Sequence, residues 1–247
     1  MSSRRTVNIF LPSSRRSPAR SQAGRGVGHV TSLVSKPGGA RGRTAEDCRR
    51  GGEGWLDYGD LDSANGDRAT GVEACLDSAY IKAHPGSDTN VKKVAPPGYQ
   101  WARRYAAYLG NGPLGQWVDA CHLLGKDLGG DGQKLENLST CARSTNANQI
   151  APTDSGITEH MYYYEKQVKA AVDQGQVVHY QVKPVCMGPR TVPVAYEMSA
   201  TGTLNGQPGL MLDDVVPNMM YSNKDSNWSN IGTVTHQGKP LPTGNTR

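Results

Sequence analysis

The sequence predicts an α+β fold, in which helices accompany a central antiparallel β-sheet. Two patterns predict the sheet and the helix. After residue 175, apolar side chains recur at every second position in runs that glycine, proline and asparagine separate, as in half-buried strands. Before these runs, residues 157–174 carry apolar side chains three and four positions apart, as on one face of a helix.

Two extended segments precede the predicted helix. In residues 68–76, apolar and polar side chains alternate, as in a half-buried strand. Residues 117–124 form a second expected strand, which leads directly into a loop that contains Gly125 and two further glycines. His122 therefore lies where a strand meets a glycine-rich loop.

The predicted helix, residues 157–174, places an acid on its apolar face. Gly175 is suited to end this helix, because glycine readily adopts the left-handed conformation found after many helices. Glu165 lies four residues after Met161 and three before Val168, so it falls on the apolar stripe. A carboxylate that faces inward needs a partner, and Glu165 is therefore a candidate functional residue.

Three strands are expected after the helix. They cover residues 178–182, 192–198 and 210–216. A turn at residues 187–190 separates the first two, and Asn205-Gly206, a dipeptide typical of two-residue hairpins, separates the last two. Such short connections predict an antiparallel meander.

Charge divides the chain into a basic segment and an acidic body. Residues 1–45 contain nine Arg and Lys and no acid, which leaves 27 − 9 = 18 cations against 22 anions, a balance of −4, in the remainder. We interpret residues 1–45 as a disordered basic tail, residues 46–236 as the folded domain and residues 237–247 as a loose C-terminal tail. The basic tail could bind anionic polymers, serve export or act as a linker.

Localisation is predicted from targeting signals and cysteines together. The sequence has no stretch of about 20 apolar residues that could cross a bilayer, and no apolar segment typical of a cleaved signal peptide follows Arg4 and Arg5. The five cysteines include no C-x-x-C pair. Export would favour one or two disulfides and a free thiol, whereas the alternative is small buried apolar side chains. We expect a protein secreted or delivered out of the producing cell, with a cytoplasmic location as the alternative.

Single polar residues from position 122 to position 165 indicate phosphodiester hydrolysis. A neutral imidazole, here that of His122, can deprotonate water because its reference pKa is about 6.5. Asn137 and Asn146 lie 146 − 137 = 9 residues apart, and an amide oxygen can hold a hydrated Mg²⁺ ion that offsets charge on the phosphate. The alternatives are a hydrogen-bonded structural histidine and asparagines that cap helices or form turns.

An ordered series of motifs extends through residues 55–218. In chain order they are Asp67-Arg68-Ala69-Thr70, Pro96-Pro97-Gly98-Tyr99, Cys121-His122-Leu123-Leu124-Gly125, Leu128-Gly129-Gly130, Asn137-Leu138, Arg143, Asn146, and Met161 with Glu165. With this series the segment resembles the DNA/RNA non-specific endonucleases of the ββα-metal, or His-Me finger, superfamily, and most of all their bacterial secreted branch.

The resemblance implies a role for each matched residue. His122 would be the general base, Asn146 the protein ligand to Mg²⁺, for which Mn²⁺ could substitute, and Asn137 and Glu165 would support the water shell of the metal. The substrate would be DNA, or RNA as well. The family usually carries arginine two residues before the histidine, where this sequence has Ala120.

Arg143 and Arg68 are the candidates to replace that arginine at the phosphate of the nucleic acid. Two other functions stay open. One is a nuclease fold that binds nucleic acid but has lost its activity with that arginine. The other is the same nuclease acting as a secreted antibacterial toxin, with an immunity or inhibitor protein as its partner. The sequence does not define an oligomeric state.

Overall fold

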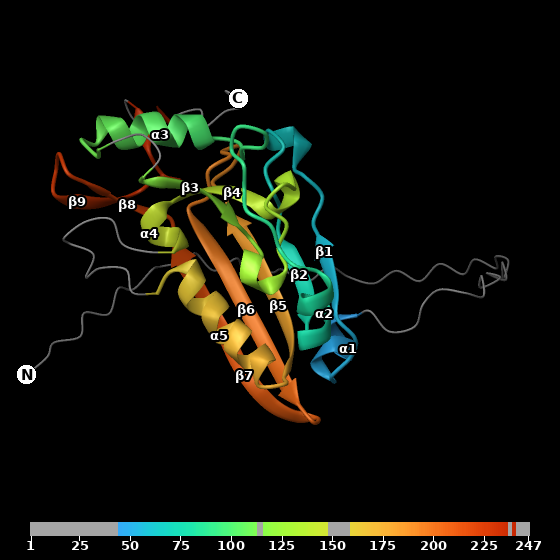
Figure 1. Cartoon of the computed structure of the whole chain (residues 1–247). Helices are drawn as coiled ribbons and strands as arrows, with labels where there is room; N and C mark the ends of the chain where they lie inside the picture. Colours follow the sequence, from blue (N-terminus) through green and yellow to red (C-terminus); the bar gives the residue numbers. More distant parts are fainter. Residues whose placement is uncertain (1–43, 113–115, 148–158, 237–238, 241–247) are drawn as a thin grey trace, which may run out of the picture. The chain divides into compact units, whose positions relative to one another are not determined.

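A five-stranded antiparallel sheet forms the larger layer of the fold. A computed structural model describes residues 44–112, 116–147, 159–236 and 239–240 (Figure 1). The strand order is β1-β2-β5-β6-β7, and every neighbouring pair is antiparallel. The strands are β1 (Trp55–Tyr58), β2 (Val72–Leu76), β5 (Val177–Val185), β6 (Ala195–Leu204) and β7 (Gln207–Pro217). The predicted α+β class and the antiparallel meander, here β5-β6-β7, are confirmed.

The alternation of side chains explains how this sheet builds a core. On β5, Val178, Tyr180 and Val182 are buried, whereas Gln181 and Lys183 are exposed. Asn205 and Gly206 both have positive φ, as the predicted two-residue hairpin requires. Strand β1 has only four residues and was not predicted, because such a short run carries too little alternation to be recognised.

Helix α5 (Met161–Asp173) covers one face of the sheet. It shares the main apolar cluster with β5, β6 and β7 through Met161, Val168 and Val172. The predicted start at residue 157 is wrong: residues 157–158 lie outside the described residues, and His160 has extended backbone and caps the helix by accepting the N–H of Tyr163. After Gln174, Gly175 has a positive φ of 85°, as expected for a residue that ends a helix.

A separate hairpin and a short helix follow one another in the order ββα. Strands β3 (Val118–His122) and β4 (Leu138–Ala142) pair only with each other among the described strands, and α4 (Arg143–Asn146) continues directly from β4. The predicted strand at residues 117–124 therefore exists, slightly shortened, but lies outside the five-stranded sheet. This ββα unit carries the candidate base and the candidate metal ligand.

Smaller elements complete the described part of the chain. They are α1 (Ala45–Arg49), α2 (Ser78–Ala83), α3 (Tyr99–Tyr108), β8 (Met219–Ser222), β9 (Asn227–Asn230), β10 (Thr235–His236), β11 (Lys239–Pro240) and three short 3-10 turns. Ala45 is already helical, whereas the rest of the predicted basic tail, residues 1–43, lies outside the described residues. Of the predicted C-terminal tail, only residues 239–240 are described. No described helix is long and apolar enough to cross a membrane.

Two disulfides each link two elements of secondary structure. Cys48 on α1 is bonded to Cys75 on β2, and Cys121 on β3 is bonded to Cys141 on β4, while Cys186 is a free thiol. The expectation of one or two disulfides with a single free thiol therefore agrees with the structure. The alternative of five unbonded cysteines is wrong for four of them.

Candidate active site

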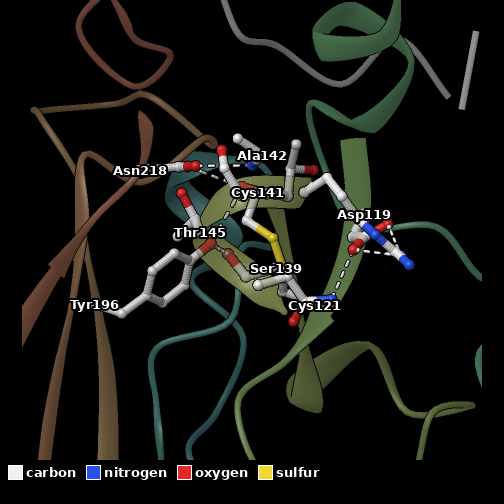
Figure 2. The surroundings of a disulfide bond; sticks show 12 residues. Asp119, Cys121, Ser139, Cys141, Ala142, Thr145, Tyr196 and Asn218 are labelled. Atoms are coloured by element: carbon white, nitrogen blue, oxygen red, sulfur yellow. Dashed lines mark hydrogen bonds and ion pairs between the residues drawn. A yellow bond between two sulfur atoms is a disulfide. The ribbon is translucent and has the colours of Figure 1, made fainter. Parts of the chain in front are cut away.

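The β3–β4 hairpin places the predicted site residues in register. His122 lies opposite Leu138, so that Asn137 is next to the base, and Asp119 lies opposite Cys141 at the other end of the hairpin. The Cys121–Cys141 disulfide crosses between the two strands (Figure 2). Because α4 follows β4 without a linker, the geometry of this hairpin also fixes where α4 begins.

The imidazole of His122 has a defined tautomer. Its Nε2 lies 3.0 Å from the carbonyl oxygen of Ser87. A carbonyl can only accept a hydrogen bond, so Nε2 carries the proton and Nδ1 presents a lone pair. Burial lowers the pKa of His122 below its usual value, although the carboxylates of Asp88 and Asp131 act in the opposite direction. His122 is therefore neutral at neutral pH, which is the state that a general base requires.

Asn137 fixes the loop that follows the base. Its side chain is fully buried and forms three hydrogen bonds to backbone groups. Oδ1 accepts from the N–H of Leu124 at 2.8 Å, and Nδ2 donates to the carbonyls of Leu124 and Asp131 at 3.1 and 3.2 Å. Through these contacts Asn137, which directly precedes β4, holds both Leu124 and Asp131, the residues at the two ends of the loop. Asn137 therefore orders the backbone that follows His122.

Glu165 reaches the same loop from α5. A Cβ atom at Gly125 would collide with the Glu165 carboxyl group, so only glycine permits this close approach. Burial raises the pKa of Glu165 to about 8, and the nearby Asp127 carboxylate adds to this shift, whereas a hydrogen bond from the Gly125 backbone opposes it. The predicted inward direction of Glu165 agrees with this position, because its carboxyl group approaches Gly125, which lies three residues after His122 in the chain.

Asn146, the predicted metal ligand, is held by an aspartate. Its Nδ2 lies 2.7 Å from Oδ2 of Asp119. Because a carboxylate accepts and does not donate, the amide nitrogen must face Asp119, which leaves Oδ1 as an oxygen ligand directed elsewhere. Arg143 is bound to the same carboxylate, with Nη1 3.0 and 2.9 Å from the two oxygens of Asp119.

Asp119 is the site residue that the sequence reasoning missed. The available signal was a charged residue in the middle of a short, otherwise mostly apolar segment three positions before the candidate base. Its function depends on contacts 24 and 27 residues further along the chain. Spacing alone could not connect these positions.

The two arginines predicted to contact phosphate differ in their environment. Arg143 is next to Asn146 in the site, and 46% of its side chain is exposed. Arg68 has only 17% of its side chain exposed and binds Asp62 at 2.8 Å and the carbonyls of Gly188 and Arg190. These contacts use the Arg68 guanidinium to join two loops, whereas Arg143 shares the Asp119 carboxylate with Asn146.

The donor set fits one hydrated divalent ion. Within the described residues there is no group of three or more His, Cys, Asp or Glu side chains that could enclose a metal ion. A magnesium ion needs no such enclosure, because it keeps several waters and often takes only one or two protein oxygens. The amide oxygen of Asn146, which accepts no hydrogen bond from the described residues and has a carboxylate beside it, suits this type of coordination.

Comparison with known proteins identifies the class of enzyme. A family model matches residues 46–203, which is well over half of the chain, and this family consists of nucleases. The chain is therefore a hydrolytic nuclease. Its family is the DNA/RNA non-specific endonucleases, to which the chain belongs. The resemblance inferred from the sequence motifs is confirmed.

Solved structures with a similar fold are also nucleases by name. Metal-free NucA from Streptococcus agalactiae is 20% identical, with 72% of this chain and 78% of that chain covered and a TM-score of 0.49. Sda1 nuclease with a bound zinc ion is 19% identical, with coverages of 67% and 76% and a TM-score of 0.49. An extracellular endonuclease is 18% identical, with coverages of 72% and 86% and a TM-score of 0.43. No curated protein matches the chain.

Proposed function

We propose that this nuclease hydrolyses phosphodiester bonds of DNA, and of RNA as a second substrate, without sequence specificity and with Mg²⁺ as its cofactor. Mn²⁺ is expected to substitute for Mg²⁺. The observation that carries the proposal is the hydrogen bond from Nε2 of His122 to the Ser87 carbonyl, which leaves Nδ1 free as a base. Contacts to phosphate and metal carry little sequence information, which agrees with a non-specific enzyme.

In the proposed mechanism, Nδ1 of His122 removes a proton from a water molecule. The resulting hydroxide attacks phosphorus in line with the 3′ oxygen, which leaves without a covalent enzyme intermediate. When bound, the metal ion supplies positive charge to the phosphate oxygens and the leaving oxygen. Asn146 would hold this ion through Oδ1, and the Glu165 carboxyl group would accept hydrogen bonds from its waters.

The remaining residues orient these groups. Asp119 keeps the Asn146 amide in one orientation, and Asn137 keeps the loop after His122 in place. Arg143 is the cation proposed to contact a phosphate oxygen. Arg68 has its donors engaged within the protein, so in this mechanism it stabilises the fold and does not replace the arginine expected at Ala120.

We further propose that the enzyme acts outside the cell that produces it. The support is the pair of disulfides, which persist in oxidising compartments and are rare in reducing cytosol. No contact in the described part of the chain favours a toxin over a nuclease of another role.

Cleavage of supercoiled plasmid and of RNA tests the metal dependence. The purified protein should nick both in Mg²⁺ or Mn²⁺ and neither in EDTA, and Asn146→Ala should need far more metal for the same rate. A wild-type protein that binds plasmid but leaves it intact in Mg²⁺ and Mn²⁺ would instead establish the non-catalytic alternative.

A further inference from the structure

Helix α4 cannot define its own orientation. It consists of only four residues, Arg143–Asn146, and isolated helices of fewer than about 12 residues are marginal in water. The residue that precedes it, Ala142, provides no side-chain cap. The direction of Asn146 at the end of α4 must therefore be set by contacts with other parts of the protein.

A buried asparagine makes the main contact with the start of α4. Asn218 lies between β7 and β8 and has no exposed surface. Its Oδ1 accepts the backbone N–H of Ala142 at 2.9 Å (Figure 2). Its Nδ2 donates to the carbonyls of Thr140 and Pro193 at 3.2 and 2.8 Å. One side chain thus joins the end of β4, the start of α4 and the segment that enters β6.

The residues on either side of Asn218 hold the rest of α4. Thr145 donates through Oγ1 to the carbonyl of Pro217 at 3.1 Å and accepts the N–H of Met219 at 3.0 Å. Ser144 donates to the carbonyl of Met219 at 2.5 Å. The chain from Pro217 to Met219 therefore binds three of the five residues from Ala142 to Asn146.

We propose that Asn218 is a positioning residue for the metal ligand Asn146. The proposal rests on the proposed function, in which Asn146 binds a divalent cation. Asn218 does not itself contact metal or substrate. It fixes the first turn of α4 while Asp119 fixes the Asn146 amide at the other end, so that the two contacts together define where Oδ1 of Asn146 lies.

Binding of Mn²⁺ measured by electron paramagnetic resonance tests this proposal without relying on catalysis. Asn218→Ala leaves the Ala142 N–H and two carbonyls without their partner, so its dissociation constant for Mn²⁺ should rise at least about tenfold. Thr145→Val removes the neighbouring contacts and should act in the same direction. It also serves as the second variant if Asn218→Ala does not fold.

Tyr196→Phe is the matched control. The Tyr196 hydroxyl is buried and hydrogen-bonds Ser139 and the Thr140 carbonyl of β4, and these hydrogen bonds do not involve a residue of α4. We expect this variant to lose stability and to bind Mn²⁺ like the wild type. Each variant is compared well below its melting temperature, with circular dichroism to confirm the folded state.

The outcomes separate this inference from the proposed function. Unchanged Mn²⁺ affinity in folded Asn218→Ala or Thr145→Val, an equal loss in Tyr196→Phe, or no Mn²⁺ binding by the wild type would each overturn the inference. If the wild type binds Mn²⁺ with the predicted loss in Asn218→Ala but cleaves no nucleic acid, the inference stands and the proposed hydrolysis fails.

Discussion

At the scale of single residues, the Glu165 carboxyl group is the clearest case of a proposed functional group that lowers the stability of the fold. It lies close to the Gly125 backbone on the buried side of α5, and its pKa is raised to about 8 from a usual value of 4.5. An acid whose pKa is higher in the folded state binds its proton more strongly when folded. The free energy of unfolding therefore falls as pH rises from 4.5 to about 8, and changes little above that.

Replacing this acid should stabilise the metal-free protein at alkaline pH. Glu165→Gln keeps the shape of the side chain and cannot ionise. At pH 8.5 we expect its free energy of unfolding to exceed that of the wild type by about 2 to 4 kcal/mol, because a shift of one pKa unit corresponds to about 1.4 kcal/mol. At pH 4.5 the two should be nearly equal. Urea unfolding of both proteins in EDTA at pH 4.5 and pH 8.5 checks this. If the difference in their free energies of unfolding is the same at the two pH values, the pKa of Glu165 is not shifted.

The residues also show what sequence could reveal about the site. His122 and Asn146 are predictable because they belong to an ordered series of motifs. Asp119 and Asn218 were not predicted, since their roles consist of hydrogen bonds to residues 27 and 76 positions away in the sequence. Neither the spacing of residues nor the composition identifies a hydrogen-bond partner so far away in the sequence.

At the scale of elements, the β3–β4 hairpin has little stability of its own, although it carries the proposed base. It has five residues in each strand and pairs with no other described strand, and isolated two-stranded hairpins are marginally stable in water. The Cys121–Cys141 disulfide joins its strands directly beside His122 and Ala142. We infer that this bond stabilises the site itself, whereas Cys48–Cys75 attaches α1 to the sheet.

Removing each disulfide should therefore have different effects on activity. Cys121→Ala with Cys141→Ala and Cys48→Ala with Cys75→Ala should each lose about 2 to 5 kcal/mol of stability. Under conditions where both remain folded, only the first pair should lose most of its nuclease activity, by about tenfold or more. Equal specific activities of the two folded variants, measured on plasmid, would refute the inference.

The elements were predictable to the extent that their own periodicity defines them. Helix α5 and strands β5, β6 and β7 are long enough to show the patterns of 3.6 and 2 residues. The start of α5 was misplaced because the capping residue is His160, which has extended backbone and is an unusual residue type at this position. Strands β8 and β9 were missed because each has four residues and their pairing depends on the hairpin they form.

At the scale of the whole molecule, the site depends on how three parts of the fold meet. The hairpin supplies His122, α4 supplies Asn146, and α5, packed on the large sheet, supplies Glu165. The fold class followed from the sequence because the sheet and its helix are regular. The docking of the hairpin onto that sheet did not, since it depends on buried polar contacts such as that from Asn218, which follows β7, to the Thr140 carbonyl of β4.

The central claim is that His122 is the base of a metal-dependent nuclease, and the pH dependence of kcat/KM on plasmid at saturating Mg²⁺ tests it most directly. Only the neutral imidazole can accept a proton, and burial lowers the pKa of His122 below 6.5. At pH values below this lowered pKa, kcat/KM should therefore fall about tenfold per pH unit. His122→Ala should lose about 10² to 10⁴ in rate together with this acid limb. A folded His122→Ala variant that keeps the wild-type rate, or that keeps the same acid limb, would contradict the claim.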